Sequence, residues 1–313
     1  TGFVMGTAMA GIATIAYTQE ALTGASHKKV GPRFIPKILG NIAAANIAID
    51  YNIQGPSFTV STACSSGGDA INTACMCMQS GKADIMLAVG AESVLCPLVI
   101  YSLANAKALS RRNDSPSTAS RPFDVTRDGF VIGEGGGALV LETEEHALAR
   151  GAKIYAEIRG CGNTDDAYHV TAPHPEGRGA IACMKQAIAE AGINPSDIGY
   201  INAHGTATNK GDTVETSSIK KVFGNTLPYV SSTKGATGHM MGAGGITETI
   251  TCVKAIETGT VPPTINLNEV DPECAGIDFV ANTAKKAEIN FAMSNAFGFG
   301  GQNSSIIVGK YGK

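Results

Sequence analysis

Apolar, β-branched segments alternate with segments of helical periodicity along nearly the whole chain. The pattern predicts a buried strand at residues 58–63, a helix at 67–79 and a further strand at 83–91, which together make a βαβ unit. Such alternation is typical of an α/β protein and excludes a β-sandwich or a helical bundle. The fold class is therefore α/β.

A second series of alternating elements follows Arg150, and no low-complexity linker precedes it. Apolar residues at helical spacing predict helices around 181–191 and 243–253. Short apolar runs predict four strands, at residues 198–202, 229–231, 291–296 and 304–308. The chain thus divides into two similar α/β halves, residues 1–150 and 151–313.

Two local patterns carry more specific predictions. The three glycines at 135–137 predict a tight turn between strands at 129–132 and 138–142, because a strand rather than a helix follows them and no dinucleotide fingerprint results. Asp212 and Glu215 form a capping-box pattern, which predicts the start of a helix that ends near Gly224.

Composition excludes several functional classes. The net charge of −3 lacks the basic footprint of a nucleic-acid-binding protein. No apolar run reaches the ~20 residues that cross a bilayer, and the first residues lack the basic segment of a signal peptide. The 8 cysteines lie in apolar stretches rather than in a loop framework, so we expect reduced thiols and a cytoplasmic location.

Cys64 is the sharpest local feature, because a buried strand ends there and small residues let a helix begin at once. A thiol at a helix N-terminus faces unpaired N–H groups and the positive end of the helix dipole, which predicts a lowered pKa and a nucleophile. On this evidence alone, a small apolar core residue is an equal alternative.

Two histidines, His204 and His239, follow strands of the second half and are flanked by glycines. Such a position suits proton transfer or hydrogen bonding to an oxyanion, although either histidine alone could be structural. Lys234 and Glu248 offer a charge pair that could orient the imidazole of His239. A metal site is not predicted, because Cys75 and Cys77 point to different faces of a helix, and the loop of His169 and His174 shows no third ligand.

Several strings occur together: the turn at 60–67, Asn-Ala-His-Gly-Thr-Ala-Thr at 202–208, Ser-Thr-Lys at 232–234 with Gly-His at 238–239, and Asn-Ala-Phe-Gly-Phe-Gly-Gly at 295–301. From about Gly6 to its end, the chain resembles the elongating type II β-ketoacyl-acyl carrier protein synthases. The resemblance implies a thiolase-like fold, in which two duplicated α/β halves form five αβαβα layers, usually in a homodimer. It also implies a βαβα portion ahead of Thr1, so the first half is expected to be incomplete.

The resemblance also assigns roles to residues. Cys64 is expected to accept the acyl group, and His204 and His239 are expected to bind the malonyl thioester oxygen, with Lys234 and Glu248 as supporting charges. Three further positions match the substrate channel: Thr206 and Thr208 beside the pantetheine arm, and Met9 at the floor of the acyl pocket. The backbone N–H of Phe299 is expected to join that of Cys64 in an oxyanion hole, with the Phe299 side chain as a gate.

The implied reaction is a decarboxylating condensation of acyl-Cys64 with malonyl-acyl carrier protein in fatty acid elongation, without a metal or redox cofactor. The implied partners are acyl carrier protein and a second copy of the chain, with neither nucleic acid nor membrane. The alternatives are a polyketide ketosynthase and a non-catalytic partner subunit. A thiolase is disfavoured because the loop at 298–302 has no second cysteine.

Overall fold

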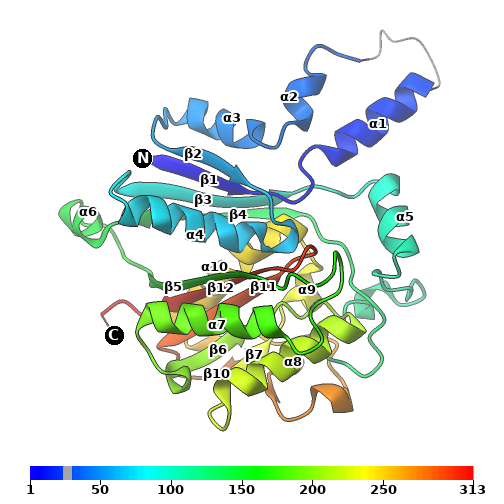
Figure 1. Ribbon diagram of the computed structural model, residues 1–313, viewed down its shortest axis with the longest axis vertical. Coiled ribbons are helices and arrows are strands. Elements are labelled where there is room, and N and C mark those ends of the chain that lie inside the picture. Colours follow the sequence, from blue (N-terminus) through cyan, green and yellow to red (C-terminus); the bar gives the residue numbers. More distant parts are fainter. Residues whose placement is uncertain (24–29, 313) are drawn as a thin grey trace.

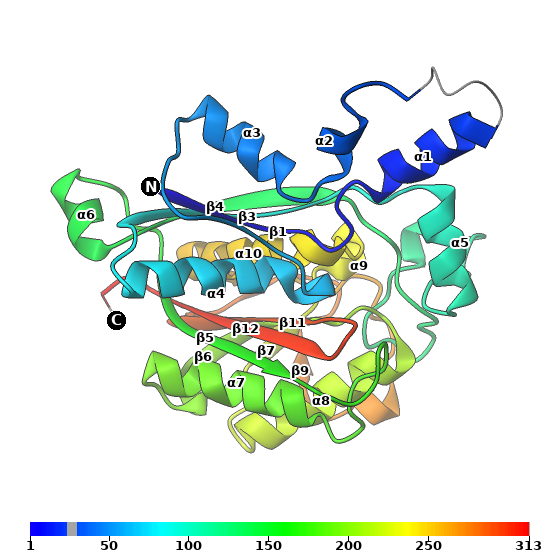
Figure 2. The ribbon, with the colours of Figure 1, turned by 45° about the horizontal axis from the view of Figure 1, so that its top comes forward.

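The computed structural model describes residues 1–23 and 30–312, and most of its strands form two sheets that face each other across a pair of helices. From top to bottom in Figures 1 and 2, helices α1 to α3, the first sheet, the pair α4 and α10, the second sheet, and helices α7 and α8 follow one another. This is the expected five-layered αβαβα arrangement, so the predicted fold class is confirmed.

The first sheet has the order β2-β1-β3-β4, with β2 at its edge. Its central strand β1 pairs in parallel with β2 and β3, whereas β4 is antiparallel to β3. The strands of this sheet are β1 (Gly2–Gly6), β2 (Ser57–Val60), β3 (Ile85–Glu92) and β4 (Gly135–Glu142).

The second sheet has the order β5-β12-β11-β6-β7-β9. Strand β6 is parallel to β7 and β11, and β12 is antiparallel to β11. Its strands are β5 (Glu157–Asp165), β6 (Ile198–Asn202), β7 (Tyr229–Ser231), β9 (Asp278–Phe279), β11 (Phe291–Phe297) and β12 (Gln302–Gly309). Strands β8 (Thr260–Val261) and β10 (Lys285–Lys286) form a separate pair.

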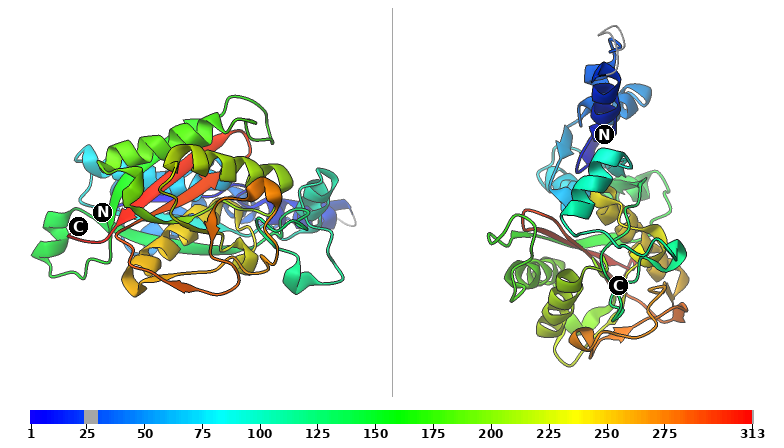
Figure 3. Two further views of the ribbon diagram at one scale, coloured as in Figure 1. Left: turned by 90° about the horizontal axis from the view of Figure 1, so that it is seen from below. Right: turned by 90° about the vertical axis from the view of Figure 1, so that its right-hand side faces the viewer.

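The helices are α1 (Ile12–Thr23), α2 (Phe34–Ile38), α3 (Ile42–Asp50), α4 (Ser66–Gln79), α5 (Pro97–Asn105), α6 (Glu144–Ala149), α7 (Arg178–Ala191), α8 (Asn209–Phe223), α9 (Lys234–Thr237) and α10 (Gly244–Thr258). Seen from below, α7 and α8 lie across the outer face of the second sheet (Figure 3). No helix in the described ranges has the length and apolar character needed to span a bilayer.

The two sheets repeat one topology. In each, two parallel pairings and one antiparallel pairing follow in order, so that β2, β1, β3 and β4 correspond to β7, β6, β11 and β12. Helix α4 follows β2, and α10 follows β7. The end of β2 and the end of β7 are therefore equivalent places in the two halves.

Glycines let the two central helices approach each other at their N-termini. A Cβ on Gly67 would lie 2.7 Å from the backbone N of Ile246, and one on Gly245 would lie 2.4 Å from the backbone N of Gly68. Such distances leave no room for a side chain on either helix. The turns that lead into α4 and α10 are consequently held side by side.

Two predictions from the sequence are wrong: the turn at residues 135–137 and the strand at residues 129–132. These glycines are the first residues of β4 rather than a turn. Glycine is needed at position 137 because α10 packs on the strand there, and a Cβ would lie 2.8 Å from Ile246 Cγ2. Residues 129–132 join no sheet; instead, the backbone N–H of His239 donates to Val131 O at 2.7 Å. That segment holds the loop of His239 in place.

Candidate active site

Cys64 lies between β2 and α4, in a short 3-10 turn, Ala63–Ser65, so the predicted strand-to-helix position is confirmed. The prediction of a buried strand at 58–63 is wrong, because β2 is an edge strand that ends at Val60 and leaves Phe58 exposed. Ser66 Oγ donates to Ala63 O at 2.6 Å and accepts the backbone N–H of Thr62 at 2.9 Å, which closes the turn. The Cys64 side chain is buried. The turn lies so close to the 297–301 loop that a Cβ on Gly298 would lie 2.8 Å from Thr62 O.

His239, from the loop after β7, lies closest to the thiol, with its Nε2 3.1 Å from Cys64 Sγ. His204, from the loop after β6, stands with its ring perpendicular to that of His239 at a centroid distance of 5.3 Å. The Nδ1 atoms of both rings are buried and, within the described residues, have no hydrogen-bond partner. No contact at Nδ1 among the described residues therefore fixes the tautomer of either histidine.

Electrostatics differ from the sequence prediction at Cys64. Burial raises the pKa of the thiol to about 11, whereas a hydrogen bond from the Phe299 backbone and the charge of Lys234 lower it by smaller amounts. The expectation of a lowered pKa is therefore wrong for the substrate-free site, because desolvation outweighs the helix N-terminus. Burial, with the charge of Lys234, also holds the pKa of His204 and His239 well below the usual value. At neutral pH the three groups are a thiol and two neutral imidazoles.

Lys234 and Glu248 form an ion pair at the start of α9 and within α10, and both side chains are buried. Burial raises the pKa of Glu248 to about 7, and the ammonium group of Lys234 opposes that rise. The pair places a positive charge near both histidines, as their lowered pKa values show. Its effect is to keep the imidazoles unprotonated.

A cavity of about 570 Å³ opens over these groups and is lined by Cys64, His204 and His239. The other predicted substrate residues, Met9, Thr206, Thr208 and Phe299, also line it. The hydroxyl groups of Thr206 and Thr208 lie 3.1 Å apart. The side chain of Phe299 is 38% exposed at the rim, where a gate would stand. All nine predicted site residues thus lie at the cavity or in the ion pair beside it.

Sequence reasoning misplaced Asp212 and Glu215, which lie inside α8 instead of capping it, since the helix begins three residues before Asp212. Glu215 accepts the backbone N–H groups of His204 and Gly205, each at 2.8 Å. Asp212 accepts the backbone N–H of Ala207 at 3.2 Å. These buried carboxylates hold the loop that carries His204, a role that only their spacing from the histidine could have suggested.

Replacing Glu215 by Gln should lower kcat about 10-fold to 100-fold, because one backbone N–H would face an amide N–H and His204 would shift. The KM for the acyl donor should change little, since both carboxylate oxygens of Glu215 accept backbone N–H groups of the His204 loop. Glu190→Gln is the matched control, because Glu190 accepts the Cys161 backbone N–H at 3.1 Å far from the cavity. Steady-state kinetics of both variants check this; equal losses in the two would contradict it.

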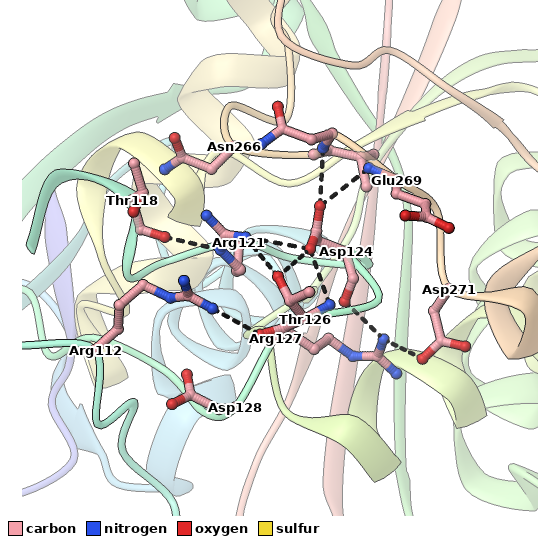
Figure 4. Close-up of polar contacts among 12 residues, drawn as sticks. Arg112, Thr118, Arg121, Asp124, Thr126, Arg127, Asp128, Asn266, Glu269 and Asp271 are labelled. Atoms are coloured by element: carbon pink, nitrogen blue, oxygen red, sulfur yellow. Dashed lines mark hydrogen bonds and ion pairs between the residues drawn. The ribbon is translucent and has the colours of Figure 1, made fainter. Parts of the chain in front are cut away.

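The loop between α5 and β4 in the first half forms hydrogen bonds and an ion pair with the second half, and Figure 4 shows those of Asp124 and Arg127. Buried Arg127 pairs with Asp271 at 2.5 Å and donates to Asn209 O at 3.0 Å. Arg121 lies 3.3 Å from Asp124, whose pKa is held at about 2 by hydrogen bonds that outweigh its burial. This network anchors the loop that precedes α8 and hence the threonines of the cavity.

Glu92 holds the backbone of two loops on the other side of the cavity. Its carboxylate accepts the backbone N–H groups of Ala8, Met9 and Gly242 at 2.6, 3.1 and 3.1 Å. Gly242 follows the histidine loop, whereas Met9 follows β1, so one buried side chain joins the predicted pocket floor to the His239 loop. No motif marks this role in the sequence.

A thiol from one half and two imidazoles from a topologically equivalent half converge on one cavity, which defines a condensing enzyme of the thiolase-like fold. Comparisons with known proteins agree. The family described as "Beta-ketoacyl synthase, N-terminal domain" matches residues 1–147, and "Beta-ketoacyl synthase, C-terminal domain" matches residues 155–268. The chain belongs to the β-ketoacyl synthase family.

Among its relatives, the 3-oxoacyl-[acyl-carrier-protein] synthase 2 of Rhizobium meliloti is 45% identical over 99% of this chain and 74% of its own length. The mitochondrial 3-oxoacyl-[acyl-carrier-protein] synthase of Arabidopsis thaliana is 44% identical over 98% of this chain and 68% of its own. A type II polyketide ketosynthase, solved with its acyl-carrier protein, superposes with a TM-score of 0.92 at 35% identity, over 98% of this chain and 78% of that one. This chain is an acyltransferase, a β-ketoacyl-acyl carrier protein synthase of fatty acid elongation.

Proposed function

We propose that Cys64 is the nucleophile that accepts the acyl group and that His204 and His239 act on the malonyl group. The observation that carries this assignment is the 3.1 Å contact between Cys64 Sγ and His239 Nε2, with His204 beside it in the same cavity. Acyl carrier protein delivers both thioesters, as its complex with the related polyketide ketosynthase supports.

In the first half-reaction, Sγ attacks the acyl thioester carbonyl while the thiol proton passes to His239 Nε2. Attack with simultaneous proton transfer suits a thiol whose pKa is about 11, since a free thiolate is scarce at neutral pH. The backbone N–H groups of Cys64 and Phe299 hold the oxyanion. When the C–S bond of the donor breaks, the pantetheine thiolate takes the proton and leaves, and His239 is neutral again.

In the second half-reaction, the histidines donate hydrogen bonds from ring N–H groups to the malonyl thioester carbonyl. Loss of carbon dioxide leaves an electron pair as an enolate at that carbonyl, which neutral imidazoles stabilise. The carbanion then attacks the acyl carbon, a C–C bond forms, and the Cys64 thiolate leaves and takes up a proton from solvent. His239 accepts in one step and donates in the next, which its unpartnered Nδ1 permits because either tautomer is available.

The remaining assignments concern binding and assembly. Thr206 and Thr208 bind the pantetheine arm, Phe299 gates its entrance, and the pair Lys234–Glu248 keeps the histidines neutral. The chain acts as two halves divided at residue 150, which the two sheets support, since β4 ends before that residue and β5 begins after it. A homodimer remains part of this proposal.

Incubating the protein with an acyl-acyl carrier protein and weighing it intact tests the assignment. We expect a mass increase of one acyl group, mapped to Cys64 by peptide analysis, and none in Cys64→Ala. A non-catalytic partner subunit would gain no acyl mass. Fatty acid elongation is favoured over a polyketide pathway because identity is 45% to a 3-oxoacyl-[acyl-carrier-protein] synthase 2 and 35% to the polyketide ketosynthase.

A cytoplasmic location is also part of the proposal, supported by eight free cysteines, as expected in a reducing compartment. Relatives named as mitochondrial and chloroplastic in Arabidopsis thaliana make an organelle the alternative.

Shortening Met9 should extend the acyl chains that the protein accepts, because its side chain then no longer fills the inner end of the cavity. Met9→Ala should elongate a primer longer than the longest primer used by the parent. Met76→Ala is the matched control, since Met76 is 53% exposed on α4. Product lengths measured by mass spectrometry decide; an unchanged profile in Met9→Ala would place the pocket floor elsewhere.

A further inference from the structure

The side chains of Cys64, His204 and His239 offer one ligand atom each, and these atoms lie within 4.8 Å of one another. In a tetrahedral zinc site, bonds of about 2.0–2.3 Å place the ligand atoms roughly 3.3–3.8 Å apart. Cys64 Sγ and His239 Nε2 are already 3.1 Å apart. The ligand atoms therefore lie close enough together for one ion to bind all three.

The donor set selects a particular class of ion. One thiolate and two neutral imidazoles suit borderline ions such as Zn²⁺ and Co²⁺, whereas Mg²⁺ and Ca²⁺ require oxygen ligands. Three protein ligands with a fourth position open to solvent or substrate is the pattern of accessible zinc sites. Here the fourth position would face the cavity, which all three residues line.

The surroundings can accommodate the added charge. Binding replaces the Cys64 proton, which leaves to solvent as the S–metal bond forms, so the net charge of the site rises by one and no electron is transferred. The neighbouring ammonium of Lys234 is paired with Glu248, which reduces its repulsion of the added charge.

We infer that Cys64, His204 and His239 form a binding site for a borderline divalent metal ion, represented by Zn²⁺, which inhibits the enzyme reversibly. The bound ion occupies the Sγ electron pair that attacks the acyl donor and a ring nitrogen of each histidine. Binding rests on the geometry of the three side chains alone, whereas inhibition rests on the roles proposed for them. Acyl thioester and metal should therefore exclude each other.

Cobalt titration of the metal-free protein tests binding without an activity assay. We expect one Co²⁺ per chain, with the visible bands of tetrahedral cobalt and a near-ultraviolet thiolate-to-cobalt band. Zn²⁺ should abolish both signals by displacement, and Mg²⁺ should not. Cys64→Ala should lose the thiolate band, and His239→Ala should weaken binding at least tenfold. The control variants are Cys75→Ala, on α4, and His169→Ala, whose ring accepts backbone N–H groups of its own loop; both should bind like the parent.

The outcomes separate the two proposals. Cobalt bound without a thiolate band, or bound equally by a folded Cys64→Ala protein, would overturn the metal site. Condensation that proceeds at the parent rate with zinc bound would overturn inhibition. A protein that shows the predicted cobalt spectrum but never gains acyl mass would retain the metal site and lose the proposed nucleophile. Acylation of Cys64 before titration should prevent binding, and circular dichroism checks that each variant is folded.

Discussion

Cys64→Gln should abolish condensation and still release carbon dioxide from malonyl-acyl carrier protein. The Gln side chain cannot act as a nucleophile, so the rate of condensation should fall on the order of 10⁴-fold or more. The amide is similar in reach to an acyl-cysteine and leaves His204 and His239 in place. The malonyl site therefore stays formed, and the enolate is protonated to give acetyl thioester.

Carbon dioxide release and the thioester products are measured in parallel by mass spectrometry. Cys75→Ala is the control, because it removes another thiol from α4 and should retain both reactions. A folded Cys64→Gln protein that releases no carbon dioxide would mean that decarboxylation requires the thiol. In that case the division of labour between the two halves would be wrong.

His239→Ala should lose decarboxylation and also slow acylation, whereas His204→Ala should lose mainly decarboxylation. Removing one oxyanion donor costs about 100-fold to 1000-fold. The difference between the two variants follows from geometry, because His239 Nε2 lies 3.1 Å from Sγ and can take the thiol proton. No described contact joins His204 to that sulfur atom.

Single-turnover acylation, followed by intact mass, and carbon dioxide release separate the two steps in each variant. Acylation of His204→Ala should stay within a fewfold of the parent rate. Equal slowing of acylation in both variants would show that His239 is not the specific proton acceptor. Release of carbon dioxide at the parent rate by His239→Ala would remove this residue from the malonyl site.

The sequence alone predicted part of the elements and their order, among them α4, β3, α7, β6, β11 and β12, because strands and helices depend on the periodicity of near neighbours. It predicted neither β1 nor β5. It placed Cys64 at a strand-to-helix turn and both histidines after strands of a second, similar half. The recurring strings around these residues also indicated the family. Each of these predictions depends on residues close together in the chain and therefore needs no knowledge of the tertiary packing.

Predictions from local patterns were wrong where the structural role of a residue depends on a distant partner. The glycines at 135–137 form a strand because α10 packs on them, and Glu215 supports His204 instead of capping its helix. The pKa of Cys64 is raised rather than lowered as a helix N-terminus would lower it, since burial removes water from the thiol.

The meeting of Cys64 with His239, 175 residues away, is likewise a tertiary result. The two turns are equivalent ends of a repeated topology, and glycines on α4 and α10 let those helices touch beside them. The sequence by itself therefore determined the fold class and the reactive residue types. The tertiary structure decided their distances, charges and supporting carboxylates, because desolvation and long-range contacts exist only once the two halves pack together.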